Sequence, residues 1–182
     1  MGHEGHDHDH DHDHDHDPVA EHRDTSPTSV SAWVITCSDT RDGGTDRGGP
    51  LLRHLLEHAG HSVVGTSLVK DLPDEIRRAM GQAKDSGVRA IVLTGGTGLS
   101  SRDVTVETVE AMLQRRIDGF GELFRMLSFQ QIGAAAMASR ALAGVWDGIV
   151  VFALPGSPAG ATLAMNKLVL PELGHLVREV SR

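Results

Sequence analysis

Short apolar runs rich in β-branched residues alternate along this chain with segments whose apolar residues recur at helical spacing. Residues 30–36 (VSAWVIT), 62–68 and 90–94 (AIVLT) have the composition of strands. Between them, residues 50–59 and 72–83 carry apolar side chains three and four positions apart, as amphipathic helices do. This alternation predicts a parallel sheet with right-handed crossovers and helices on both faces.

The same alternation continues through the rest of the chain. The predicted elements are a buried strand at 149–154 and helices at 104–113, 122–131, 134–139, 158–167 and 171–180. Pro171 is expected to separate the last two helices, because proline cannot donate an intrahelical hydrogen bond. We therefore predict one α/β domain over residues 29–182, with three α/β/α layers around a mostly parallel central sheet.

The N-terminal segment differs from the rest of the chain in composition. Residues 1–28 show no apolar periodicity and are predicted to be a disordered tail and linker. Histidine and aspartate alternate through this tail, and closely spaced imidazoles bind Zn²⁺, Ni²⁺ or Cu²⁺. The candidate metal ligands are His6, His8, His10, His12, His14 and His16. A metal buffer and a solvated tail or expression tag with incidental metal affinity are both open interpretations.

Charge and composition exclude several classes of protein. Nine of the 25 acidic residues and one of the 17 basic residues lie within 1–24, so the remainder holds sixteen of each. Without a basic surplus, and with no tyrosine for base stacking, the domain is not expected to bind nucleic acid. No apolar run is long enough for a membrane span or a secretory signal, so we expect no membrane partner. The single Cys37 fits the reducing cytoplasm and is expected to be buried.

Glycine-rich and polar segments follow the predicted strands. Ligands in open α/β sheets bind beyond the carboxyl ends of strands, where Ser38-Asp39, Thr94–Gly98 and residues 155–158 would lie. The sequence Thr94-Gly-Gly-Thr-Gly98 lets backbone amides approach a phosphate closely, although it is neither a P-loop nor a dinucleotide fingerprint. On its own, the segment is also explained as a tight strand–helix turn.

Two aspartates are candidates for metal-assisted chemistry. Asp71 follows the second strand, and Asp103 begins the helix after the glycine loop. Helix capping explains each alone. Beside a phosphate, however, two carboxylates need a divalent cation between them, which predicts Mg²⁺-assisted phosphoryl or nucleotidyl transfer. Arg102 and Lys70 adjoin them and could contact further phosphate oxygens.

Three histidines near the second predicted strand could form a metal cluster. His54 and His58 are one helical turn apart, and His61 follows shortly after. Because no third ligand is evident on the helix face, a solvated face is the favoured interpretation.

Several segments together resemble one known family. They are Thr94–Gly98, Arg102-Asp103-Val-Thr105, 119–128 (GFGELFRMLS), 139–144 (SRALAG) and 154–158 (LPGSP). In order and spacing they resemble the MoaB/Mog family of molybdenum cofactor biosynthesis. The resemblance implies a MoaB/Mog-like fold that assembles as a homotrimer or homohexamer. It also implies adenylylation of molybdopterin by ATP and Mg²⁺, before a separate downstream enzyme inserts the metal. A non-catalytic protein that binds molybdopterin or its precursor is the alternative.

The resemblance also assigns roles to residues. Asp71 and Asp103 match the family's catalytic acids and would hold Mg²⁺. The positions matched to molybdopterin binding are Thr94, Gly95, Gly96, Thr97, Gly98, Glu122, Ser139 and Ser157. Those matched to nucleotide binding are Ser38, Asp39, Asp46 and Gly156. The family's Asp-x-Ser-Gly is replaced here by Asp46-Arg-Gly-Gly49, which removes one hydroxyl from the nucleotide side.

Overall fold

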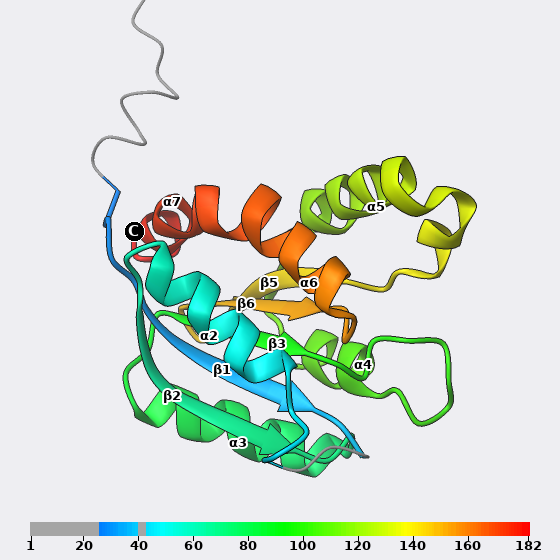
Figure 1. Ribbon diagram of the computed structural model, residues 1–182. Coiled ribbons are helices and arrows are strands. Elements are labelled where there is room, and N and C mark those ends of the chain that lie inside the picture. Colours follow the sequence, from blue (N-terminus) through cyan, green and yellow to red (C-terminus); the bar gives the residue numbers. More distant parts are fainter. Residues whose placement is uncertain (1–25, 40–42) are drawn as a thin grey trace, which may run out of the picture.

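A six-stranded sheet lies at the centre of the computed structural model, which describes residues 26–39 and 43–182 (Figure 1). Its strands are β1 (Ser31–Cys37), β2 (Ser62–Val69), β3 (Ala90–Thr94), β4 (Arg115–Arg116), β5 (Leu142–Trp146) and β6 (Ile149–Leu154). They are ordered β2-β1-β3-β6-β5-β4, with the first four parallel and the last two antiparallel to their neighbours. The predicted mostly parallel sheet is confirmed.

Helices cover both faces of this sheet. They are α2 (Gly48–His58), α3 (Pro73–Asp85), α4 (Thr105–Glu110), α5 (Asp118–Ile132), a 3₁₀ helix (Gly133–Ala138), α6 (Pro158–Ala164), a π-helical turn (Met165–Val169) and α7 (Leu170–Val180). One hydrophobic core joins the sheet to α2, α5, α6 and α7, and a second joins it to α3 and α4. The predicted three-layer α/β/α architecture is therefore confirmed (Figure 1).

Strand β3 shows why the sheet is buried on both sides. All five of its residues are buried. Ala90 and Val92 belong to the core beneath α2 and α7, while Ile91 and Leu93 belong to the core beneath α3 and α4. A strand covered on both faces needs an unbroken apolar run, and AIVLT supplies it.

The sheet contains two strands that the sequence analysis did not predict. Strands β4 and β5 lie between the predicted helix at 104–113 and the predicted strand at 149–154. Strand β5 forms a hairpin with β6 through Asp147 and Gly148, whose φ angles are 51° and 77°. Two positive φ angles in a two-residue loop match the twist of antiparallel strands, and Asp-Gly is a strong signal for such a turn. The pattern was present in the sequence but was not used.

The expected break at Pro171 was wrong. The chain stays helical from Pro158 to Val180, through a π-helical turn at Met165–Val169, after which Leu170 and then Pro171 begin α7. The wider turn accommodates the proline ring and its missing N–H donor, so the helix continues past it.

Four other predicted helices have different limits or a different type in the structure. Leu72 was expected on a buried helical face, but it precedes α3 and is 49% exposed, because the helix begins at Pro73. Helix α4 is shorter than the predicted 104–113, and α5 begins four residues before the predicted 122–131. The predicted helix at 134–139 is the 3₁₀ helix.

The connections after β1 and β3 position the functional site. These two strands are neighbours, yet α2 follows β1 on one face of the sheet while α4 follows β3 on the other. Where neighbouring connections diverge to opposite faces, they leave a crevice at the carboxyl ends of the strands. The segment after β1 and the glycine loop after β3 therefore face each other.

The described chain begins beside α7, where the Pro27 carbonyl packs against Gly174. Most of the predicted tail, with His6, His8, His10, His12, His14 and His16, lies outside the described residues. Within residues 26–39 and 43–182, no helix is long and apolar enough to cross a membrane.

Candidate functional site

Two cavities adjoin at the carboxyl ends of β1, β3 and β6. A polar cavity of about 290 Å³ is lined by Cys37, Ser38, Asp39, Asp71, Gly95, Gly96, Ser100, Arg102, Asp103 and Gly156. A more apolar cavity of about 350 Å³ lies next to it, and Gly156 lines both. The glycine loop Thr94–Gly98 contributes to both cavities, so it forms part of the wall between them.

The glycine loop brings the two candidate acids together. Gly96 has a φ of 61°, and a Cβ there would collide with the Asp71 carboxylate. At Gly98, a Cβ would lie 2.8 Å from Asp103 Oδ2. The two carboxylates therefore pack against one loop at positions two residues apart. Only glycine leaves room for both acids, which is the physical reason for the loop's composition.

Asp71 is the more buried of the two acids, with 8% of its surface exposed. Its Oδ1 accepts hydrogen bonds from the Val104 amide and the Thr105 hydroxyl, both at 3.3 Å. Its own amide donates to Asp39 Oδ1 at 3.0 Å. Burial raises the pKa of Asp71, and the nearby charges of Asp103 and Asp39 raise it further. The cavity thus concentrates negative charge.

Asp103 is held differently. Its Oδ2 accepts from the Ser100 amide at 3.1 Å, which closes a tight turn before α4. Arg102 is exposed and also lines the polar cavity. Lys70 is not among the residues that line this cavity, and its amide donates to Glu75 Oε2 at 3.4 Å.

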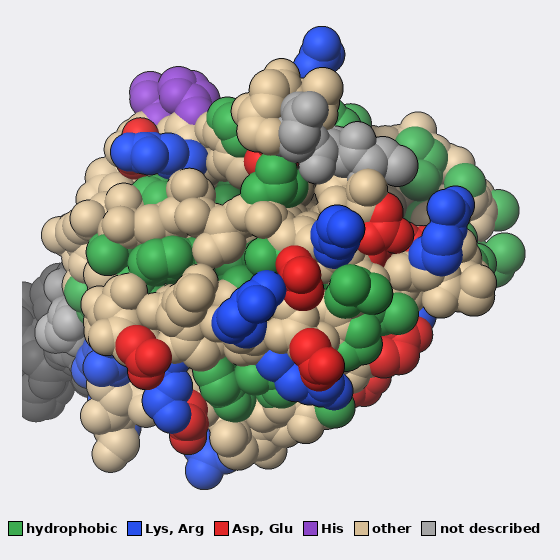
Figure 2. Space-filling view, turned by 90° about the horizontal axis from the view of Figure 1, so that it is seen from below, with side chains coloured by type: hydrophobic (Ala, Val, Ile, Leu, Met, Phe, Trp, Pro, Cys, Tyr) green, Lys and Arg blue, Asp and Glu red, His purple; other side chains and the backbone are tan. Residues whose placement is uncertain are grey.

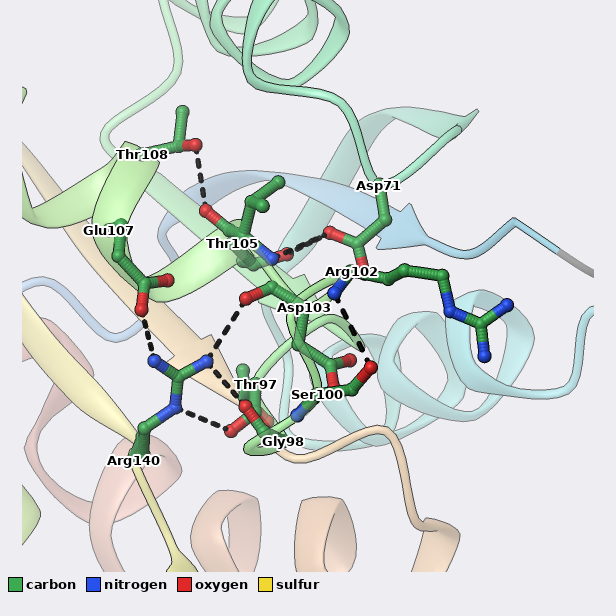
Figure 3. Close-up of polar contacts among 11 residues, drawn as sticks. Asp71, Thr97, Gly98, Ser100, Arg102, Asp103, Thr105, Glu107, Thr108 and Arg140 are labelled. Atoms are coloured by element: carbon green, nitrogen blue, oxygen red, sulfur yellow. Dashed lines mark hydrogen bonds and ion pairs between the residues drawn. The ribbon is translucent and has the colours of Figure 1, made fainter.

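Arg140 fixes the glycine loop from the other side. Figure 3 shows its guanidinium between the loop and α4. It donates to the carbonyl oxygens of Thr97 (3.3 Å), Gly98 and Asp103 (3.1 Å). It also pairs with Glu107 of α4. The planar fork of donors binds both ends of the segment 97–103 and sets its shape.

Arg140 was not predicted as a site residue, although it lies in the segment 139–144 that carries part of the resemblance. Its partners are three backbone carbonyls about 40 positions away and the Glu107 carboxylate, and the segment itself does not indicate these contacts. Thr97, Gly98, Ser139 and Ser157, which the resemblance matches to molybdopterin binding, all line the more apolar cavity. Gly156, which it matches to nucleotide binding, lines both cavities. The remaining walls of the more apolar cavity are Phe124, Ser128, Gln131, Ile132, Ala135, Ala136, Ala138, Pro155, Ala159, Gly160 and Leu163. Most of these residues are apolar or small, and such a lining suits the binding of a flat ring.

The matched residues Thr94, Ser157 and Asp46 also have structural partners. The Thr94 hydroxyl is buried and donates to the Pro155 carbonyl at 2.8 Å, which ties two strand-end loops together. The Ser157 Oγ accepts from the Gly160 amide at 3.3 Å and caps α6, as the sequence predicts. Asp46 lies outside both cavities.

The Asp46 carboxylate accepts hydrogen bonds at the start of α2. It accepts from the Thr36 hydroxyl and the Gly48 amide, each at 2.9 Å, and from the Gly49 amide at 3.2 Å. Glu122 is likewise apart from the two cavities. It lies exposed on α5 and lines a separate cavity of about 230 Å³ with Arg116 and Arg125.

The remaining candidates from the sequence have simple explanations. His61 is buried, and its Nδ1 accepts from the Val30 amide at 3.3 Å, so it is not a third ligand for His54 and His58. No group of three or more metal-ligating side chains occurs within the described part of the chain. Cys37 is buried, as predicted, and burial raises the pKa of its thiol to about 12.

Comparisons with known proteins agree on one family. Residues 33–175 match the family described as a probable molybdopterin binding domain. Molybdenum cofactor biosynthesis protein B of Bacillus cereus is 47% identical over 167 residues, covering 90% of this chain and 98% of the relative. A crystal structure of molybdenum cofactor biosynthesis protein B has a TM-score of 0.81 at 48% identity, covering 86% and 99% of the two chains. The tungsten cofactor synthesizing protein MoaB from Pyrococcus furiosus has a TM-score of 0.81 at 32% identity, covering 86% and 100%.

Proposed function

The chain belongs to the MoaB/Mog family of molybdenum cofactor biosynthesis proteins, and on that premise we propose that it adenylylates molybdopterin with ATP and Mg²⁺. The products are adenylylated molybdopterin and pyrophosphate. The observation that carries this proposal is the convergence of Asp71 and Asp103 on one glycine loop in the polar cavity.

A Mg²⁺ ion fits the donor atoms of the polar cavity. Asp71 and Asp103 both line this cavity and supply carboxylate oxygens, which Mg²⁺ prefers as protein ligands, and substrate phosphate oxygens would complete the coordination. Burial raises the pKa of Asp71, the charges of Asp103 and Asp39 raise it further, and a divalent cation would offset that negative charge. We assign Asp71 and Asp103 as the residues that hold the ion. When bound, it would offset negative charge on the phosphates of ATP.

The two cavities divide the substrates between them. The pterin ring of molybdopterin occupies the more apolar cavity, and its terminal phosphate points toward the glycine loop. ATP occupies the polar cavity beside Ser38, Asp39 and Gly156. An oxygen of the molybdopterin phosphate attacks the α-phosphorus of ATP, and the bond from that phosphorus to the departing pyrophosphate breaks. The protein contributes mainly by positioning the reacting groups in line.

The direct test is pyrophosphate release from ATP, Mg²⁺ and molybdopterin. The wild-type chain should release pyrophosphate, and Asp71→Asn and Asp103→Asn should each lower the rate by about 100-fold or more. Asp74→Asn is the matched control, because Asp74 is an exposed aspartate of α3 paired with Arg77. Retained activity in both site variants would refute the roles given to the two acids.

A binding protein without transferase activity is the second candidate. It is favoured by the position of Asp46. The Asp46 carboxylate accepts hydrogen bonds from Thr36 and from the Gly48 amide at the start of α2, and it does not line the polar cavity. In that case calorimetry would show molybdopterin binding while no pyrophosphate is released. Loss of both binding and release would refute both candidates.

Two kinds of protein partner follow from the family. A downstream enzyme that inserts the metal would receive the product, and further copies of the chain would form a trimer or hexamer. Exposed apolar side chains on α5 and the 3₁₀ helix support self-association: Leu123, Met126, Phe129, Ile132 and Met137.

A further inference from the structure

The outer side of α2 carries two histidines that the proposed reaction does not use. His54 and His58 are four positions apart, so they lie on the same side of the helix. Their rings stack with centroids 5.9 Å apart and planes 21° apart, and both residues are exposed. Figure 2 shows histidine atoms as one raised patch beside basic and acidic side chains.

We propose that His54 and His58 form a chelate site for a divalent transition metal ion of the Cu²⁺, Ni²⁺ and Zn²⁺ class. Histidines four positions apart on a helix are spaced to bind one metal ion. Metal–nitrogen bonds of about 2.1 Å place two imidazoles that share an ion with their centroids about 5 Å apart. The observed separation of 5.9 Å is within about 1 Å of this value, and rotation of the two exposed side chains turns the nearly parallel rings toward a shared ion.

The neighbouring groups define what kind of site this is. Glu57 lies between the two histidines in sequence, but its Oε1 accepts from Arg53 Nε at 2.8 Å. His61 is buried and accepts from the Val30 amide. The described part of the chain therefore supplies two nitrogen ligands, and water fills the remaining positions. Among divalent ions, such an open nitrogen site binds Cu²⁺ most tightly.

Val30, which directly precedes β1, lies beside the C-terminal end of α2. The Val30 amide donates to His61 Nδ1 at 3.3 Å, and the Val30 carbonyl accepts from Ser62 at 3.0 Å, just after α2 ends (Figure 1). Further histidines precede Ser26 in the sequence: His3, His6, His8, His10, His12, His14, His16 and His22. These imidazoles compete for the same metal, so an experiment must separate them from the helix pair.

The test is a Cu²⁺ titration near neutral pH, followed by calorimetry and electron paramagnetic resonance. The starting protein is the full-length chain with the eight N-terminal histidines replaced by asparagine. We expect one Cu²⁺ per chain and a spectrum with two nitrogen ligands. His54→Ala and His58→Ala should each weaken binding by about tenfold or more, and the double variant should lose little beyond that. This non-additivity is the signature of chelation, because either substitution removes the shared ion.

The controls separate the site from folding and from the proposed reaction. Glu57→Gln should leave Cu²⁺ binding unchanged, because its carboxylate is occupied by Arg53. Alanine at 54 and 58 preserves the helix and leaves pyrophosphate release unchanged, because both side chains are exposed and outside the two cavities. Cu²⁺ binding that survives both alanine substitutions, or that falls by independent equal steps, would overturn the proposal. A two-nitrogen spectrum seen only with the native N-terminal histidines would also overturn it.

Discussion

Replacing Arg140 by lysine tests how the glycine loop is held. The guanidinium donates to three carbonyl oxygens, those of Thr97, Gly98 and Asp103. It also pairs with Glu107. A lysine keeps the charge and can keep the ion pair, but its compact ammonium group cannot span three carbonyls arranged around a planar fork. Arg140→Lys therefore removes about two charge-assisted hydrogen bonds at constant net charge.

The expected size of the effect follows from the exposure of this side chain. Each hydrogen bond to a charged group contributes about 1.5 to 3 kcal/mol when well shielded. The Arg140 side chain is 24% exposed, so water competes for the lost contacts and we expect about 2 kcal/mol in total. That free energy corresponds to a factor of about 30. Amides of Gly95–Asp103 should exchange with solvent about 30-fold faster, and pyrophosphate release should fall by a similar factor.

The assay is hydrogen exchange followed by mass spectrometry on full-length protein. Arg116→Lys is the matched control, because Arg116 pairs with Glu110 and Asp118 and does not contact the loop. Exchange in the loop that is equal in the two variants would refute the reasoning. Slower catalysis with unchanged exchange would also refute it, because Arg140 would then act on a substrate and not on the loop.

Further predictions concern stability and assembly. Burial raises the pKa of Asp71, so its ionised form destabilises the fold, and Asp71→Asn should raise the Tm at neutral pH. Calorimetry should show that gain disappearing as the pH falls below the ordinary carboxyl value of 3.8, where the carboxyl is protonated in both states. Gly148→Ala, at a φ of 77° with open space around it, should cost about 1 kcal/mol and lower the Tm, whereas Gly81→Ala within α3 should raise it. Phe129→Glu should lower the mass measured by light scattering to that of one chain, and an unchanged mass would exclude this face from the assembly.

Local sequence patterns predicted the elements that depend on local chemistry. The apolar run AIVLT is typical of a strand covered on both faces, and the structure shows that the glycines after it allow a close approach of other groups. The acids at 71 and 103 were placed at one edge of the sheet by strand order alone, and both line the polar cavity. These inferences held because period, composition and topology all favoured the same arrangement.

The features that were missed depend on partners far away in the sequence. Arg140 contacts the glycine loop because Thr97 and Gly98 present their carbonyls to it, and the residues around Arg140 do not indicate those partners. The Pro171 prediction followed a sound local rule that the preceding π-helical turn overrides. The hairpin at Asp147–Gly148 is different, because Asp-Gly is a local turn signal and the sequence alone was sufficient to predict it.

Asp71 shows why helix capping and metal binding are not competing explanations. Val104 precedes α4 and has no side chain that can cap it, while the Asp103 carboxylate accepts from Ser100 instead. The Val104 amide donates to Asp71, 33 positions away, so this acid supplies the acceptor that the helix start needs. One carboxylate oxygen thereby holds Asp71 at the cavity wall despite its burial. The hydrogen bond that stabilises the start of α4 also keeps Asp71 in place beside Asp103. The sequence around either residue indicates only one of these two roles.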